Sequence, residues 1–188
     1  MVSRYEPVIT INAMVKVGRW TIGPVHYGPP RHCDRCNTWH KYVYVCTIDA
    51  DVPDDIVREK LSNERVWWVG STCGPTLGMV SDAQWAVSEE EWEGWAKDFK
   101  KAIKLAMRAT QTIEQARAQG YDNDFMKLVV DDLELLMKNR LPARRRRVMA
   151  SLLGFIEGWL QKKAEAAKAG AALPPTPWAH SSLRDRAR

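Results

Sequence analysis

One short stretch constrains the fold of this chain more than any other feature. The segment RHCDRCNTWHKYVYVC, residues 31–46, holds three of the four cysteines and two of the four histidines. Cys33 and Cys36 are separated by two residues, a spacing that lets two thiolates on a tight turn bind one ion at about 2.3 Å. We therefore expect a zinc knuckle here, with Zn²⁺ as a structural cofactor.

Two segments that follow the knuckle are predicted to pair as strands. KYVYVCTI and RVWWVG are rich in β-branched and aromatic residues. A hairpin of these strands would return Cys73 to the side of the knuckle. Pro75 favours a helical turn that begins just after Cys73, where the helix dipole and free amides stabilise a thiolate. This order of knuckle, hairpin and cysteine resembles a treble-clef or zinc-ribbon arrangement.

The residue that completes the zinc site is left open by the sequence. His40 lies four residues beyond Cys36 and can turn back to the ion, so it is the preferred fourth ligand. The alternative for His40 is a surface histidine at the start of a strand. Cys46 would give a set of four cysteines, but it lies within a predicted strand, where core packing is the alternative. His32, next to the knuckle, is the third candidate.

Motifs of zinc-dependent and phosphate-transferring enzymes are absent from the sequence. No glutamate stands two residues after a cysteine or histidine, as zinc deaminases require. The metalloprotease motif HExxH is missing, and GSTCGPTLG lacks the Lys-Ser/Thr ending of a phosphate-binding loop. We therefore expect a structural zinc site in a protein that is not an enzyme.

The distribution of apolar residues favours a cytoplasmic protein with no membrane partner. No apolar run approaches the about 18 residues that span a bilayer. The N-terminal segment MVSRYEPVITINAMVKVG lacks the uninterrupted apolar run of a secretory signal. Cytosolic thiols stay reduced, so a cysteine pair there indicates a metal site more often than a disulfide.

Residues 31–78, with the pattern CDRC…YVYV…WWVGSTCGPTLG, resemble a small module found in many uncharacterised proteins of bacteriophages and actinobacteria. The resemblance implies that Cys33, Cys36 and Cys73 are zinc ligands, and it says nothing of the rest of the chain. Asn37 stands where the module usually has glycine. The connection between the two strands is also longer here, so residues 49–64 form an insertion that could be a contact surface.

Pro53 favours a short helix over 54–61. From Ser88 onward the apolar residues recur with a period of 3.6, and SEEEW at this point is a capping box. Three amphipathic helices follow: the first stops at Gly120, Asp122 is expected to cap the second, and Pro142 opens the third. The apolar side of the third is expected to contain Val148, Leu152, Phe155, Ile156, Trp159 and Leu160.

These patterns predict an α+β protein in which a small zinc-bound antiparallel β module is followed by an antiparallel three-helix bundle. The expected boundaries are 1–87 for the module, 88–170 for the bundle and 171–188 for a flexible Pro-rich tail. A tryptophan-rich face is expected either to pack on the zinc-bearing half or to anchor a partner; its residues are Trp85, Trp92 and Trp95.

Basic residues are concentrated in the helical half. The net charge of +5 lies entirely in residues 88–188, because residues 1–87 hold equal numbers of acidic and basic side chains. The run Arg144–Arg147 falls at the positive end of the third helix, where each cation costs about 0.3–1 kcal/mol. A local cost of this kind often marks function. The alternative is a solvated cluster offset by Asp131, Asp132 and Glu134.

Arginine side chains and helix N-terminal amides both bind phosphate oxygens. The expected nucleic-acid-binding residues are Arg144, Arg145, Arg146, Arg147, Lys97, Lys100, Lys101, Lys104 and Arg108. We expect a non-enzymatic, zinc-stabilised protein that binds nucleic-acid backbone as a small subunit of a nucleoprotein complex. The resemblance alone implies that this complex belongs to a phage or mobile element. The alternative is a protein-interaction module, such as a phage-encoded inhibitor of a host or defence protein. Phosphate binding weakens steeply as salt rises, whereas a tryptophan-anchored interface does not.

Overall fold

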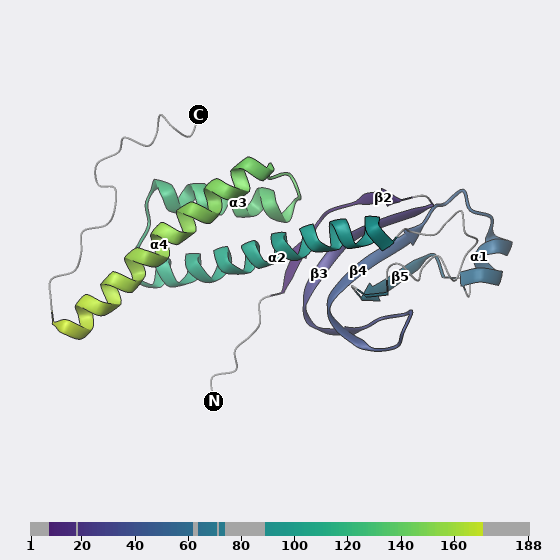
Figure 1. The fold of residues 1–188 in the computed structure, drawn as a ribbon, viewed down its shortest axis with the longest axis horizontal. Helices are drawn as coiled ribbons and strands as arrows, with labels where there is room; N and C mark the ends of the chain where they lie inside the picture. Colours follow the sequence, from purple (N-terminus) through teal and green to yellow (C-terminus); the bar gives the residue numbers. More distant parts are fainter. Residues whose placement is uncertain (1–7, 18, 62–63, 71, 74–88, 171–188) are drawn as a thin grey trace. The chain divides into compact units, whose positions relative to one another are not determined.

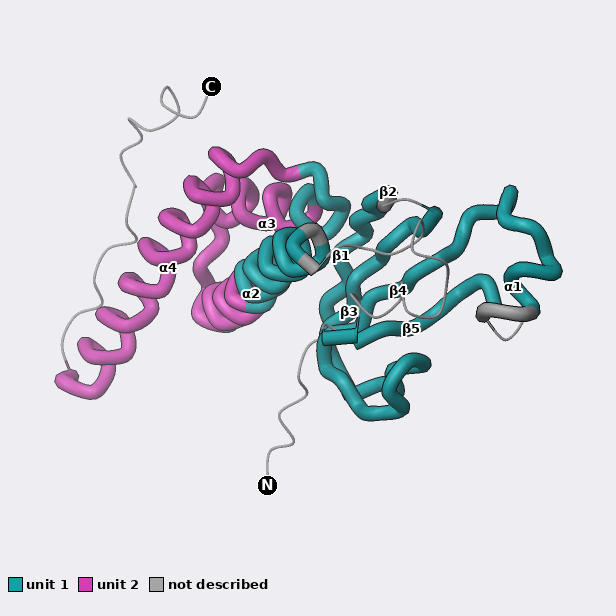
Figure 2. The backbone as a smooth tube through the Cα atoms, turned by 45° about the vertical axis from the view of Figure 1, so that its right-hand side comes forward, with its two compact units in different colours: residues 1–107, 135–140 teal, residues 108–134, 141–188 magenta. Residues whose placement is uncertain are grey.

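The computed structural model describes residues 8–17, 19–61, 64–70, 72–73 and 89–170 (Figure 1). The chain is α+β, as the sequence predicts: an antiparallel sheet is followed by three long helices. It divides into two compact units, one formed by residues 1–107 with 135–140 and the other by residues 108–134 with 141–188 (Figure 2). None of the described helices combines the length and apolar character that a bilayer span requires.

The sheet is antiparallel throughout, and its path runs β1-β3-β4-β5, with β2 also paired to β3. Its strands are β1 (Ile9–Ile11), β2 (Val15–Val17), β3 (Trp20–His32), β4 (Trp39–Ile48) and β5 (Val66–Gly70). The predicted hairpin of β4 and β5 is confirmed, because Tyr44 pairs with Val69 and Cys46 pairs with Trp67. It returns the chain to the end of β3.

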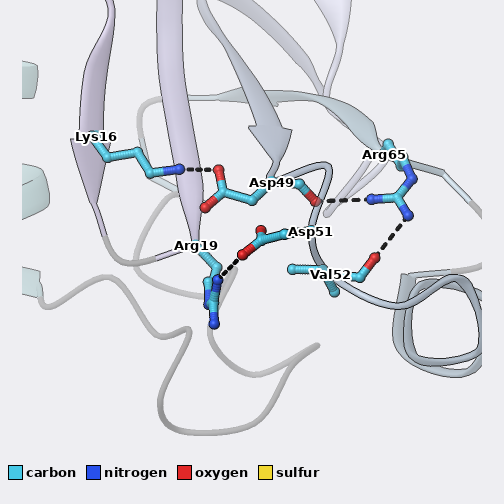
Figure 3. Close-up of polar contacts among 6 residues, drawn as sticks. All are labelled: Lys16, Arg19, Asp49, Asp51, Val52 and Arg65. Atoms are coloured by element: carbon cyan, nitrogen blue, oxygen red, sulfur yellow. Dashed lines mark hydrogen bonds and ion pairs between the residues drawn. The ribbon is translucent and has the colours of Figure 1, made fainter.

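The insertion between β4 and β5 contains the predicted short helix, α1 (Asp54–Leu61). Polar contacts hold the start of the insertion against the sheet (Figure 3). Lys16 and Arg19 form ion pairs with Asp49 and Asp51, respectively. The Arg65 guanidinium donates to the carbonyl oxygens of Asp49 and Val52 at 2.9 and 2.8 Å. The described part of the insertion is therefore tied to both β2 and the residue that precedes β5.

The N-terminal half of α2 (Glu89–Ala118) belongs to the first unit. Tyr44 of β4 is fully buried, and its ring centroid lies 4.9 Å from that of Trp92 and 6.4 Å from that of Phe99. The expectation that Trp92 packs on the zinc-bearing half is confirmed. This contact carries the first unit past the expected boundary at residue 87. Trp85, and the capping contact expected between Ser88 and Glu91, lie outside the described residues.

The other two helices are α3 (Asp124–Met137) and α4 (Ala143–Ala169). Asn123, rather than the expected Asp122, caps α3, because its side-chain oxygen accepts from the amide of Met126 at 3.1 Å. Gly170 ends α4 as predicted. Its φ of 63° is left-handed, and its amide points to the last carbonyls of the helix.

The buried face of α4 differs from the expected one by about one residue. Met149, Leu153, Ile156 and Trp159 are buried, whereas Val148 and Phe155 are 40% and 55% exposed. Leucine, valine and phenylalanine occur on two adjoining faces of this helix, so the apolar pattern alone does not select one. The ring of Trp159 packs against Tyr121, with centroids 4.8 Å apart, in the core of the second unit.

Candidate metal centre

Four side chains from the knuckle, β4 and the segment after β5 converge at one point. Cys33, Cys36, His40 and Cys73 each offer one ligand atom, and these atoms all lie within 4.8 Å of one another. Ligand atoms around a tetrahedral zinc ion are about 3.5–4 Å apart, given metal–ligand bonds of about 2.0–2.3 Å. The four residues could therefore hold a metal ion with a small inward movement, and His40 is the fourth member of the cluster.

A tight turn from Cys33 to Thr38 forms the knuckle. The Cys33 amide donates to the carbonyl of Thr38 at 2.9 Å, and the Asn37 amide donates to the carbonyl of Cys33 at 2.8 Å. Asn37 has a left-handed φ of 55°. Asparagine tolerates this conformation better than most residues, and glycine adopts it freely. Asn37 can therefore hold this tight turn.

Backbone bonds tie this turn to β5. The Asp34 amide donates to the carbonyl of Trp68 at 2.8 Å, and the Trp68 amide donates to the Asp34 carboxylate at 2.6 Å. The Gly70 amide donates to the sulfur of Cys33 at 3.3 Å. The Cys73 amide then donates to the carbonyl of Gly70 at 3.0 Å and closes the turn that carries the third thiol. Pairing of β4 with β5 is therefore what brings Cys73 to the knuckle.

Thr38, Cys36 and Gly70 determine the orientation of the His40 ring. Its Nε2 lies 2.9 Å from the hydroxyl of Thr38 and 3.5 Å from the sulfur of Cys36. A Cβ atom at Gly70 would come within 2.5 Å of the imidazole Cδ2. Any side chain at position 70 would clash with the His40 ring in its present position, so this position requires glycine.

The thiols of the cluster have unequal acidities. The hydrogen bonds of Thr38 and then His40 lower the pKa of Cys36 to about 5. Burial, together with the hydrogen bonds of the neighbouring cysteines, raises the pKa of Cys73 to about 12. One thiolate therefore forms readily in this cluster while the buried thiol keeps its proton. Several thiolates at such short separation need a cation between them, and binding a metal would release the remaining protons.

The two other candidates for the fourth ligand lie elsewhere. Cys46 is fully buried among the core residues of β4, and burial raises the pKa of its thiol. His32 directs Nδ1 at the side-chain oxygen of Asn37 at 2.8 Å, and its ring packs edge-on against Trp39. All four cysteines fall in the part of the chain that the structure describes, and none of them forms a disulfide. The structure thus favours core packing for Cys46.

The arginine run at the start of α4 is not uniformly exposed. Arg145 Nε donates to both carboxylate oxygens of Asp132 at 2.9 and 3.1 Å, and Asp132 is only 1% exposed. Burial raises the pKa of Asp132, and Arg145 opposes that shift. Arg146 Nε donates to the carbonyl of Leu141 at 3.0 Å. Only Arg144 and Arg147 of the run are fully directed to solvent.

The basic residues of α2 also divide into two groups. Arg108 forms a bidentate pair with Glu157, with N–O distances of 2.8 and 2.6 Å, and Thr112 donates to the same carboxylate at 3.0 Å. Lys101 lies 3.4 Å from Asp98, and the ammonium of Lys100 lies 5.8 Å from the ring centroid of Tyr42. Lys97 and Lys104 are exposed, and within the described residues neither forms an ion pair. Arg108 therefore has a structural partner that the sequence did not reveal.

Comparisons with models of protein families, with curated proteins and with solved structures find no match for this chain. What the chain does is therefore argued from its own residues.

Proposed function

We propose that Cys33, Cys36, His40 and Cys73 bind one Zn²⁺ ion and that this ion is structural. Three thiols and one imidazole form a ligand set typical of structural zinc sites. Four protein ligands leave no coordination position for a reacting water, which supports a protein that is not an enzyme. The ion would join the end of β3, the start of β4 and the segment after β5, and so would hold one end of the sheet together.

We further propose that the chain binds the phosphate backbone of nucleic acid in the cytoplasm. The observation that carries this proposal is the start of α4, where Pro142 supplies no side-chain cap and the first turn contains no acidic residue. Helices α1 and α3, by contrast, each have an acidic first turn. The first-turn amides of α4, which Pro142 does not cap with a side chain, and the exposed Arg144 and Arg147 form a strongly positive helix end that suits a phosphate.

Two lysines of α2, in the first unit, offer a separate basic surface. Lys97 and Lys104 are seven residues apart and so lie on the same side of the helix. Both are exposed, and their ammonium groups can bind phosphates without reading bases. A role as a small subunit of a nucleoprotein complex is part of the proposal. That the complex belongs to a phage or mobile element rests on the resemblance of residues 31–78 alone.

A protein-interaction module is the second candidate. It is favoured by the insertion between β4 and β5, which is held against the sheet by the contacts of Arg65 and the two ion pairs (Figure 3). A braced segment of this kind can present α1 to a partner with little loss of entropy. Such an interface would depend weakly on salt.

Fluorescence anisotropy with labelled single- and double-stranded DNA and RNA, measured at several salt concentrations, tests the proposal. We expect the double variant Arg144→Ala/Arg147→Ala to bind more weakly. The slope of its log affinity against log salt concentration should be shallower by about 2, one for each lost phosphate contact. The matched control is Lys162→Ala/Lys168→Ala, which removes two exposed cations from the opposite end of the same helix. Wild-type protein that binds none of these probes at low salt would refute the proposal and favour the protein-interaction module.

A further inference from the structure

A cavity of about 260 Å³ opens on the first unit. The residues around it include Val8, His26, Pro29, Pro30, Arg31 and Lys41. Its walls come from β3, from β4 and from the segment before β1. The register of β3 against β4 shifts between Tyr27 and Arg31, and this irregularity opens the sheet at the cavity.

The cavity has a positive lining. Arg31 and Lys41 are exposed cations, and none of the described residues that line the cavity is acidic. His26 accepts or donates a hydrogen bond with the Thr10 hydroxyl at 2.9 Å, and burial followed by the charge of Arg31 lowers its pKa. Asp34, the acid of the neighbouring turn, has its carboxylate bound to the Trp68 amide. An anion is therefore the ligand whose charge matches this cavity.

Two stacked rings lie near Arg31. The His26 and Trp68 rings are nearly parallel, with an interplanar angle of 22° and centroids 5.3 Å apart. The Arg31 guanidinium carbon lies 4.7 Å from the centroid of Trp68. A guanidinium stacked on an aromatic ring can still donate hydrogen bonds to oxygen atoms, because its N–H groups lie in its own plane. The arrangement thus presents Arg31 in one orientation rather than as a mobile chain.

Trp39, two residues before the cavity residue Lys41 on β4, supplies an exposed aromatic surface. It is 65% exposed, and its ring is held edge-on against His32 with centroids 4.0 Å apart. Trp39 precedes Lys41 by two residues on β4, so the two side chains leave the strand on the same face. An exposed tryptophan beside cations is the combination that single-stranded nucleic-acid sites use, with bases stacked on rings and phosphates on basic groups.

We infer that this face binds single-stranded nucleic acid, with a phosphate at Arg31 and Lys41 and an adjacent base stacked on Trp39. The inference rests on the proposed function and names the form of nucleic acid that the first unit would take. An unpaired base is needed, because a base inside a duplex does not expose its ring face. His40, a residue of the metal cluster, lies between Trp39 and Lys41 in the sequence, so a bound ion would fix this part of β4.

Anisotropy with labelled single-stranded and duplex DNA and RNA of equal length tests the inference on the full chain. Trp39→Ala should lower single-strand affinity by about 5-fold to 150-fold and leave duplex affinity unchanged, the range expected for one lost stacked base. Trp39→Phe should retain most of the affinity, because it keeps a ring. The control Met14→Ala removes another exposed apolar side chain of the same unit and should have no effect.

The double variant Arg31→Ala/Lys41→Ala should lower the affinity for single strands. The slope of log affinity against log salt concentration should become shallower by about 2, one for each lost phosphate contact. Arg58→Ala, an exposed cation of α1, is its control. Unchanged single-strand binding by Trp39→Ala and by the double variant, with binding lost in Arg144→Ala/Arg147→Ala, would overturn this inference and leave the proposed function in place. A wild-type chain that binds no nucleic acid, or only an acidic peptide, would overturn both.

Discussion

Gly70 lies directly against the imidazole of His40, so that a Cβ atom at residue 70 would come within 2.5 Å of the ring. Two other ring atoms would lie at 2.6 and 2.7 Å from that Cβ, and real Cβ atoms do not approach neighbours so closely. The imidazole would have to turn away from the three thiols. Gly70, which offers no side chain as a metal ligand, thereby controls the position of the proposed fourth ligand.

Gly70→Ala should therefore weaken zinc binding by at least about 10-fold, a loss within the range seen when the residues that orient a metal ligand are changed. Affinity can be measured by competition with a chromophoric chelator. Gly94→Ala is the control, because a Cβ there meets nothing within 4 Å. This control should bind zinc normally and unfold at a slightly higher temperature, since alanine favours a helix interior. Equal zinc affinity in both variants would contradict the contact.

The identity of the fourth ligand can be tested by single substitutions. His40→Ala should lose tight zinc binding, while His32→Ala and Cys46→Ala should each retain one zinc per chain. Metal content after dialysis gives the answer. Cys46→Ala should still lose about 1 kcal/mol of stability, because it removes a buried sulfur from the core. A zinc-free Cys46→Ala variant that remains folded would move the fourth position to that cysteine.

The arginine run of α4 should separate into structural and exposed residues when stability is measured. Arg145→Ala should lower the free energy of unfolding by about 3 kcal/mol, because it leaves the buried Asp132 without its partner. Arg144→Ala should leave stability unchanged or raise it by about 0.3–1 kcal/mol, since it removes a cation from the positive end of a helix. Urea unfolding of both variants measures these effects. Equal changes in the free energy of unfolding for the two variants would show that Arg145 does not stabilise the buried Asp132.

The deficit of Arg145→Ala should also depend on pH. Burial raises the pKa of Asp132 in the folded state, so folding favours its protonated form. Without Arg145 this shift is unopposed, and the variant should regain stability as pH falls from neutrality toward the ordinary range of a carboxyl group. A deficit that stays constant on acidification would argue against a buried charge as its cause.

The ion pair of Arg108 with Glu157 predicts the opposite pH dependence. The hydrogen bond from Arg108 lowers the pKa of Glu157, so the pair stabilises the fold above the pKa of the unfolded carboxyl. The stabilisation is lost as pH falls through the lower pKa of the folded state. Glu157→Gln should therefore be less stable than wild type by about 0.5–1 kcal/mol at pH 7, a modest value because both side chains are partly exposed.

Unfolding of wild type and Glu157→Gln at pH 7 and near pH 3 compares the two proteins. The difference in their free energies of unfolding should shrink toward zero at the acidic end. Because both proteins release any bound metal on acidification, that effect cancels in the comparison. A difference that persists at pH 3 would show that the glutamine disturbs packing rather than charge.

Local patterns of the sequence were sufficient to predict the cysteine turn, the β4–β5 hairpin, α1 and the three long helices. Each depends on spacing within one segment: two residues between Cys33 and Cys36, alternation in the strands, and a 3.6-residue period after Ser88. The preferred fourth ligand, His40, also follows from local spacing, since it lies four residues beyond Cys36 and near the start of β4.

Features that depend on contacts between distant segments were not predictable. The partners Arg145–Asp132 and Arg108–Glu157 join different helices, and the packing of those helices selects them from many charged candidates. The exposure of Phe155 on α4 was not predictable for the same reason, because helix packing selects which face of α4 is buried. The cavity beside Arg31 depends on an irregular register in β3, which no simple alternation encodes.

X-ray absorption at the zinc edge, on protein reconstituted with one equivalent of Zn²⁺, tests the central claim most directly. The Cys33–Cys36–His40–Cys73 cluster predicts a four-coordinate ion with three sulfur atoms at about 2.3 Å and one nitrogen at about 2.0–2.1 Å. A shell of four sulfur atoms, a shell dominated by oxygen, or failure to retain zinc would contradict it.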